Sequence, residues 1–568
     1  MPSKLLFCVL RTGRLRQTYR LYQPYICLTS NTRNMLLPVR QVASIAAVLN
    51  HNRKMVLETS TRAAASSAEV AVNSPKVNIP PAKLHQNYGL EQPIEENYEN
   101  AVNVLNTLQS NYSVIQNSTN RHTSDSIHIQ ETLKYLGRIG ISTDQLDKLP
   151  AIHISGSKGK GSTCSLVESI LRAHGYRTGF FSSPHLVSVT ERIRLNGVPI
   201  EKDKFGRYFW KVYSQLYTNR THPRDLPAYF NCLTILAFDI FLREKVDVAI
   251  IEVGIGGRYD CTNVLRQTKT IGITSLGLEH TKLLGDSLDE IAWQKAGIIK
   301  NASDTFTVCQ PNCCLDVIRE ECQKMNSKFH LVPDIECYQW ERKPNFNSNN
   351  LAFRLNMSLA VQIALNWIGK TRPEMISTQG GTLSEMVSRG IENCFWPGRC
   401  HQILKDNKRL FLDGAHTVES MEICARWFQL CQRQGNPKLL IFNATGDRDS
   451  GKLLNILNKY IQFDAVFFSP NVASHQLKNI DSLNLCFPNE QQIKRCEENE
   501  RFWNDLTNQH KHTRCKAHVH LAIDSILKQV DNNYSSLQEC DILVTGSLHL
   551  IGAVLTALKM ESHVISAT

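Results

Sequence analysis

The feature that most constrains this chain is a segment rich in glycine and lysine, SGSKGKGS at residues 155–162. The apolar run at 151–155 predicts a β-strand before it, and the pattern of 160–174 predicts a helix after it. Glycines in such a loop let backbone N–H groups surround a phosphate, and the helix N-terminus adds partial positive charge. We therefore predict a nucleotide site, with Lys160 reaching the β- and γ-phosphates and the hydroxyl of Ser162 facing Mg²⁺.

This loop differs from the usual GxxxxGK[ST] pattern, because Gly161 separates Lys160 from Ser162. A glycine-lysine segment can also be a solvated turn. The strand predicted before the loop and the helix predicted after it favour nucleotide binding.

Short apolar runs alternate with helical segments along most of the chain. After a helix from Tyr98, strands are predicted at 151–155, 178–182, 246–253 and 270–276. Beyond a break at 392–399 the alternation restarts. It predicts strands at 409–412, 439–443, 465–469 and 542–545, and helices at 417–432 and 548–560. This order indicates an α/β fold with parallel sheets buried on both faces.

We predict two domains. A P-loop, parallel-sheet ATPase domain spans 98–395, and a smaller, Rossmann-like α/β domain spans 396–568. The polar stretch 471–535 has weak periodicity and is expected to be partly a surface insertion.

The N-terminal stretch 1–57 has nine Lys or Arg side chains and no Asp or Glu. This composition predicts a mitochondrial presequence rather than a basic tail. Translation starting at Met35 or Met55 would shorten or remove it and supply a cytosolic form. Residues 58–97, rich in Ala, Ser, Asn and Pro, indicate a linker.

Composition excludes several classes of protein. The net charge of +12 suggests nucleic acid as a partner, but without residues 1–57 the chain has 55 basic and 52 acidic side chains. No window has the 18 consecutive apolar residues of a membrane helix, so no integral membrane segment is expected. The 18 cysteines form no CxxC pair, which disfavours structural zinc and favours free thiols in a reducing compartment.

Polar side chains follow several predicted strands, at the edge where α/β sheets bind ligands. Glu252 is a candidate Mg²⁺ ligand, although it could cap a turn, and His280 would lie along the same edge. Lys295, in an amphipathic stretch, is interpreted from the residues alone as a solvated helix lysine. In the second domain, 413–416 and 443–448 could line a cleft facing the first.

Taken together, these segments resemble the folylpolyglutamate synthases, which are Mur-ligase-like, ATP-dependent amide ligases. The resemblance runs in order through YENAVNVLNTLQSN (98–111), SGSKGKGS (155–162), FFSSPHL (180–186), EVGIGGRYDCTNV (252–264), SLGLEHTKLLGDSLDEIAWQKAGI (275–298), WPGR (396–399), LDGAHT (412–417), NATGDRD (443–449) and VTGSLHLIG (544–552). It covers about 98–568 and is weakest in the polar stretch.

The resemblance implies an enzyme that adds L-glutamate to the γ-carboxylate of the glutamate tail of tetrahydrofolates or their polyglutamates. ATP would first convert that carboxylate to an acyl phosphate, and the product would be retained in its compartment. Mg²⁺ is implied, and a monovalent cation such as K⁺ is a further candidate. The resemblance also suggests a monomer in the mitochondrial matrix or at the inner membrane.

The resemblance also assigns site residues. The nucleotide positions are Gly156, Gly159, Lys160, Gly161, Ser162, Asn356, Arg399 and Asp413, and the metal positions are Ser183, Glu252 and His280, with Ser162 as a second hydroxyl. Lys295 matches a lysine that is carbamylated in some members, which reverses its interpretation as a solvated side chain. His416 matches the glutamate side of the site, and Lys160, Lys295 and His416 are the implied catalytic residues.

The sequence leaves two alternatives to folylpolyglutamate synthase activity. Dihydrofolate synthase activity, alone or in addition, would use the same ATP-site motifs. A nucleotide-binding protein without catalysis is disfavoured because Lys160, Glu252, His280, Arg399, Asp413 and His416 are all present.

Overall fold

The computed structural model describes residues 95–109, 127–345, 351–376, 381–444, 448–474, 489–508, 515, 517–534 and 539–561. The predicted presequence at 1–57, with Met35 and Met55, lies outside these residues. So does the predicted linker, apart from 95–97.

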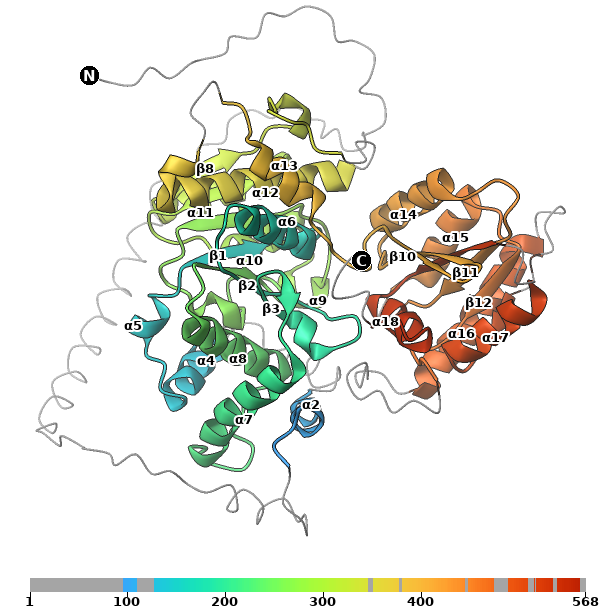
Figure 1. The fold of residues 1–568 in the computed structure, drawn as a ribbon, viewed down its shortest axis with the longest axis horizontal. Helices are drawn as coiled ribbons and strands as arrows, with labels where there is room; N and C mark the ends of the chain where they lie inside the picture. Colours follow the sequence, from blue (N-terminus) through green and yellow to red (C-terminus); the bar gives the residue numbers. More distant parts are fainter. Residues whose placement is uncertain are drawn as a thin grey trace, which may run out of the picture. The chain divides into compact units, whose positions relative to one another are not determined.

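An eight-stranded sheet, ordered β4-β3-β2-β5-β1-β6-β7-β8, occupies the first part of the described chain (Figure 1). Its strands are β1 Ala151–Ser155, β2 Thr178–Phe181, β3 Ile193–Leu195, β4 Val198–Pro199, β5 Val248–Glu252, β6 Thr270–Ile273, β7 Asp304–Thr307 and β8 Lys328–Leu331. The six strands from β2 to β8 in this order are parallel, as predicted. The antiparallel pairs β2–β3 and β3–β4 at one edge were not expected.

Helices cover both faces of this sheet. On one face, α6 Lys160–Ala173 contacts α12 Leu351–Thr371 and α13 Glu385–Glu392 (Figure 1). The opposite face is covered by α2 Tyr98–Thr107, α4 Ile127–Arg138, α7 Lys202–Thr218 and α8 Tyr229–Glu244. The remaining helical segments are α5 Thr143–Leu146, α9 Thr281–Leu284, α10 Leu288–Ala296, α11 Asn312–Lys324, and the 3₁₀ turns η3 Val189–Arg192, η4 Cys261–Val264, η5 Ile335–Cys337 and η6 Pro373–Met375. Because both faces are covered, the central strands are buried and apolar, which is why they appear as continuous apolar runs in the sequence.

A second sheet of six strands has the order β13-β12-β11-β14-β10-β9. Its strands are β9 His401–Lys405, β10 Lys408–Asp413, β11 Lys438–Phe442, β12 Ala465–Phe468, β13 Ala517–Val519 and β14 Cys540–Thr545. All pairs are parallel except β9–β10. One face packs against α14 Val418–Cys431, α15 Ser450–Tyr460 and α16 Asn489–Asn508, and the other against α17 Ile523–Asn533 and α18 Leu548–Ala557.

The described part of the stretch 471–535 contributes more to the core of the second domain than the sequence suggested. Cys496 and Trp503 of α16 are buried in the core on one face of the second sheet, and β13 is that sheet's edge strand. Ile523 and Ile526 of α17 are buried on the other face. The prediction of a surface insertion is therefore wrong for the described part of this stretch.

Among the described helices, α12 alone is long and apolar enough to cross a membrane by length and composition. Its residues Met357, Leu359 and Ile363 are buried against the sheet and α6. The apolar character of α12 is thus used in the core around the glycine-lysine loop.

Candidate functional site

The glycine-lysine loop connects β1 to α6, as predicted, and its glycines are required by close packing. Gly156 has φ +143° and Gly159 has φ +86°, conformations that favour glycine. A Cβ on Gly156 would overlap the hydroxyl of Thr274, and one on Gly159 would overlap the side-chain oxygen of Asn356. Asn356, predicted to contact the nucleotide, therefore packs directly on this loop.

Backbone contacts fix the loop at the start of α6. The N–H groups of Ser157 and Lys158 both donate to the carbonyl of Ser275, at 3.0 Å. Lys160 is the first residue of the helix, and its Nζ donates to the carbonyl of Gly156 at 2.9 Å. The predicted combination of glycine backbone, helix N-terminus and lysine is present at one place.

Lys295 of α10 reaches the same loop. Its side chain is 1% exposed, and its Nζ donates to the Gly156 carbonyl and to Glu279 Oε1, both at 2.8 Å. Burial, together with the charge of Lys160, lowers the pKa of Lys295 to about 8. The interpretation as a solvated lysine is therefore wrong, whereas the position implied by the resemblance lies in the site.

Glu279 is a site residue that sequence reasoning missed. Besides Lys295, it lies 3.7 Å from the Nζ of Lys158. Burial acts to raise the pKa of Glu279, but the combined charges of Lys295 and Lys160 hold it below its ordinary value. The sequence did contain a signal for Glu279, because it follows a predicted strand and directly precedes the candidate ligand His280.

Glu252 ends β5 and lies on the other side of β1 from β6. It is 4% exposed, and its Oε2 accepts a hydrogen bond from the backbone N–H of Ser183 at 3.1 Å. Burial raises the pKa of Glu252 to about 7, although the charge of Lys160 acts in the opposite direction. A buried carboxylate with a raised pKa is suited to binding a cation.

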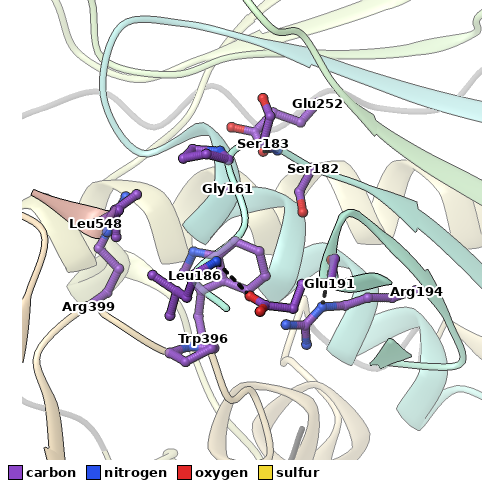
Figure 2. Close-up of a pocket in the computed structure, with 12 residues that line it drawn as sticks. Gly161, Ser182, Ser183, Leu186, Glu191, Arg194, Glu252, Trp396, Arg399 and Leu548 are labelled. Atoms are coloured by element: carbon purple, nitrogen blue, oxygen red, sulfur yellow. Dashed lines mark hydrogen bonds between the residues drawn. The ribbon is translucent and has the colours of Figure 1, made fainter. Parts of the chain in front are cut away.

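Glu252 lines a pocket that also receives residues from the second part of the chain (Figure 2). Gly161, Ser183 and Glu252 contribute from the first part of the chain, while Arg399 and Leu548 contribute from beyond Trp396. The pocket is lined by Gly161, Ser182, Ser183, Pro184, Leu186, Glu191, Arg194, Glu252, Trp396, Pro397, Arg399 and Leu548. Of the predicted residues, it thus brings together Gly161, Ser183, Glu252 and Arg399.

Trp396 packs on the loop and is held by aromatic and cationic neighbours. A Cβ on Gly161 would lie 3.0 Å from its ring, and Phe180 lies 5.4 Å away between ring centroids. The guanidinium of Arg194 lies 5.1 Å from the same ring. Trp396 therefore ties the connection between the two sheets to the glycine-lysine loop.

Asp413 ends β10, and His416 follows the strand. Asp413 accepts hydrogen bonds from the backbone N–H groups of Cys400 and Ala415, at 2.8 and 2.9 Å. Burial raises its pKa, whereas the charge of Arg399 opposes that change. His416 donates from Nδ1 to the carbonyl of Gly414 at 2.8 Å, and burial lowers its pKa to about 3. His416 is therefore neutral at physiological pH.

His280 precedes α9 with φ +48° and has a solvent-exposed surface. Burial of its ring among neighbouring groups lowers its pKa; the charge of Glu279 opposes this change, and the charges of the lysines at 158, 160 and 295 add to it. Ser162 is partly buried in the first turn of α6. Among the described residues, no three His, Cys, Asp or Glu side chains are grouped as metal ligands, so the predicted metal set depends on serine hydroxyls as well as Glu252 and His280.

Comparison with known proteins gives one family model and several relatives that match over most of the chain. The model, described as the C-terminal domain of dihydrofolate synthetase, matches residues 399–557. The mitochondrial folylpolyglutamate synthase of Bos taurus is 39% identical over 73% of this chain and 75% of its own. The human enzyme is also 39% identical, over 72% and 74%, and a Caenorhabditis elegans protein named putative folylpolyglutamate synthase is 37% identical over 81% and 92%. The chain belongs to the folylpolyglutamate synthase family. It is an enzyme, a folate–glutamate ligase.

Solved structures of the family have the same fold. Mycobacterium tuberculosis folylpolyglutamate synthase complexed with ADP has a TM-score of 0.61 at 22% identity, over 81% of this chain and 99% of that one. The apo form of the L. casei enzyme has a TM-score of 0.60 at 21% identity, over 82% and 100%. The predicted Mur-ligase-like α/β architecture is confirmed.

Proposed function

We propose that this ligase extends tetrahydrofolates by joining L-glutamate to the γ-carboxylate of their glutamate tail, with ATP hydrolysed to ADP and phosphate. The observation that carries this proposal is the pocket in which the buried carboxylate of Glu252 faces the glycine-lysine loop and Arg399. Both parts of the chain line it, so substrates held there are removed from water that would hydrolyse an activated intermediate.

The reaction proceeds in two displacements. An oxygen of the γ-carboxylate attacks the γ-phosphorus of ATP, the bond to ADP breaks, and an acyl phosphate forms. The amine of L-glutamate then attacks the acyl carbon, phosphate leaves with the electron pair of the C–O bond, and the nitrogen loses a proton to become the amide. Both steps bring anions together, so positive groups must offset their charge.

The nucleotide would be held by the residues at the loop. Gly156, Gly159 and Gly161 allow the close packing and backbone conformation of the loop, N–H groups at the start of α6 would bind phosphate oxygens, and Lys160 supplies charge. Asn356 packs on Gly159, whereas Arg399 and Asp413 approach from the second part of the chain. Two relatives support the assignment, since their structures are described as complexes with AMPPCP and with ADP.

The chemistry of the donors fits Mg²⁺, which takes oxygen ligands and keeps several waters. Glu252 would supply a carboxylate oxygen, Ser162 and Ser183 would supply hydroxyls, and His280 remains a proposed outer member of the set. When bound, Mg²⁺ supplies charge that offsets the phosphates beside the carboxylate. A nearby divalent ion would also favour the ionised form of Glu252, which burial alone disfavours.

Lys295 and His416 have separate proposed roles. With its lowered pKa, Lys295 holds a larger share of neutral amine than an ordinary lysine, which is the form that carbamylation needs. Its bond to Gly156 ties it to the phosphate loop. His416 is neutral and uses Nδ1 for Gly414, so its Nε2 is left with a lone pair that can accept from the ammonium of the incoming L-glutamate.

The proposed compartment follows from the relatives and from residues 1–57. The Bos taurus, human and Cricetulus griseus relatives are named as mitochondrial. We propose that this chain works in mitochondria, with a cytosolic form from Met35 or Met55, and as a monomer. Each added glutamate carries a carboxylate, so the lengthened product crosses membranes less readily and is retained.

Dihydrofolate synthase activity is a second candidate, favoured by the family model that matches 399–557. In that reaction the carboxylate of dihydropteroate would take the place of the folate γ-carboxylate. The same pocket would serve both reactions, so only the substrate distinguishes them.

The test is glutamate-dependent phosphate release by the full chain with ATP, Mg²⁺ and tetrahydrofolate monoglutamate, with the product identified by mass spectrometry. We expect a mass gain of one glutamyl residue, abolished in Lys160→Ala but kept in Lys324→Ala, which removes an exposed lysine from α11. A gain with dihydropteroate alone would replace the proposal with dihydrofolate synthase. No product from either substrate, despite AMPPCP binding, would refute both.

A further inference from the structure

Arg192 is a nearly buried arginine whose charge has no carboxylate partner among the described residues. It ends the 3₁₀ turn η3 and is 9% exposed. Its carbonyl accepts from the backbone N–H of Ser182 at 3.0 Å, which places it directly behind the pocket-lining pair Ser182 and Ser183. None of the ion pairs within the described part of the chain includes it.

The hydrogen bonding of Arg192 is incomplete. Its Nε donates to Nδ1 of His185 at 2.9 Å. Within the described chain, Nη1 and Nη2 of Arg192 take part in no hydrogen bond. Neither atom is fully buried, so both keep some access to solvent. The four N–H donors of these two nitrogens are therefore left without a partner among the described residues and are available to a ligand. Arg194, two residues later, is different, because it donates to the carbonyls of Glu191 and Gly197.

Aromatic side chains border Arg192 on the side of α8. Its guanidinium lies 5.4 Å from the ring centre of Tyr229. Next along the helix, the ring of Phe230 packs so closely on Gly254 that a Cβ there would come within 2.5 Å of it. Gly254 is only two residues beyond Glu252, so the neighbouring aromatic residues Tyr229 and Phe230 link the surroundings of Arg192 to those of the candidate reaction centre. Its charge acts on Glu252 and also on His549 of the second part of the chain.

The folate tail has the complementary chemistry. Its benzoyl ring is followed by a glutamate with two carboxylates, and only the γ-carboxylate reacts. We propose that Arg192 binds the α-carboxylate of the terminal glutamate and thereby aims the γ-carboxylate at the phosphate site. A guanidinium and a carboxylate match as paired donors and acceptors. This inference rests on the proposed function.

The α-carboxylate suits this arginine better than the γ-carboxylate does. The γ-carboxylate becomes an acyl phosphate and then an amide, so a cation paired to it would lose its partner during the reaction. The α-carboxylate keeps its charge throughout. Each added glutamate also presents a new terminal α-carboxylate, so one arginine can position every successive acceptor.

The test compares two acceptors that differ only in this group. One is tetrahydropteroylglutamate, and the other is tetrahydropteroyl-4-aminobutyrate, which has the reactive carboxylate but hydrogen in place of the α-carboxylate. We would measure kcat/KM and equilibrium binding of both for the wild type, Arg192→Gln and Arg192→Lys. Melting temperature and AMPPCP binding verify that each variant is folded.

The wild type is expected to prefer the glutamate acceptor by about 10- to 100-fold, the range for a charge-assisted hydrogen bond. In Arg192→Gln this preference should fall to about twofold. KM should rise because α-carboxylate binding is lost, and kcat should fall because the γ-carboxylate is no longer oriented. Arg192→Lys should keep part of the preference, and the KM values for ATP and L-glutamate should not change.

Three results would overturn the inference. The preference could survive undiminished in Arg192→Gln, it could be missing from the wild type, or the variant could change the KM for ATP or L-glutamate instead. If the wild type turned over neither acceptor, the proposed function would fail, and the binding preference alone would still decide the role of Arg192.

Discussion

Replacing Glu252 with glutamine should stabilise the metal-free protein while abolishing its activity. Burial raises the pKa of this carboxyl from 4.5 to about 7. Between these values the folded protein keeps a proton that the unfolded chain releases, so stability falls as pH rises and the loss is complete above pH 7. The difference corresponds to about 3 kcal/mol at pH 8, at about 1.4 kcal/mol per pKa unit. Glutamine retains the shape without the charge.

The measurement is thermal unfolding of wild type and Glu252→Gln in EDTA, from pH 5 to pH 8. At about 2 °C per kcal/mol for a large domain, the variant should melt about 6 °C higher at pH 8, with a smaller gap toward pH 5. Glu374→Gln, at an exposed carboxylate, should change the melting temperature by about 1 °C or less at every pH. Saturating Mg²⁺ should narrow the gap by stabilising the wild type alone. A Glu252→Gln protein that is no more stable at pH 8 than the wild type would refute the reasoning.

Three further substitutions test other parts of the structure. Gly159→Ala places a Cβ against the side-chain oxygen of Asn356 at a left-handed φ. The affinity for AMPPCP, measured by calorimetry, should therefore fall about tenfold or more. An unchanged affinity would contradict the assignment of this loop to the nucleotide. Lys295→Met removes the donor to the Gly156 carbonyl, and phosphate release should fall about 100-fold while the circular dichroism spectrum is unchanged. Asp541→Ala leaves Arg409 without its buried partner at 2.9 Å and should destabilise the protein by about 3–5 kcal/mol in urea unfolding, whereas a loss below 1 kcal/mol would contradict that role.

The central strands and the loop could be predicted because local chemistry determines them. The strand at 151–155 was predicted at the bounds of β1, since a strand buried on both faces must be apolar along its whole length. The glycines at 156 and 159 indicated a turn, and the structure shows that a side chain at either position would overlap its neighbours. The antiparallel edge formed by β3 and β4 was missed because these strands have three and two residues, too short for any period to show.

Other residues could not be placed, or were misread, because packing decided their environment. Lys295 follows Ile291 by four residues and Ala292 by three, so helical spacing put it on the buried face of α10, but a lysine there is normally solvated. Cys496 and Trp503 of α16 are seven residues apart, a spacing that matches a buried stripe on one side of a helix. The polar residues around Cys496 and Trp503 outnumber them, so this spacing was not recognised as a buried helix face.

Burial moves the two central ionisable groups of this site in opposite directions. The carboxyl of Glu252 has its pKa raised to about 7, and the amine of Lys295 has its pKa lowered to about 8. Each therefore approaches its neutral form near physiological pH, where a solvated carboxyl and a solvated amine would both be fully charged. A cation bound near Glu252 restores the charge of its carboxylate, and a phosphate bound in the loop raises the pKa of Lys295 by the same electrostatic argument. These two ligands therefore change proton binding in opposite senses. Metal binding should release protons, and nucleotide binding should take them up. Calorimetry in buffers of different ionisation enthalpy measures this proton exchange and so reveals the order in which the two ligands bind.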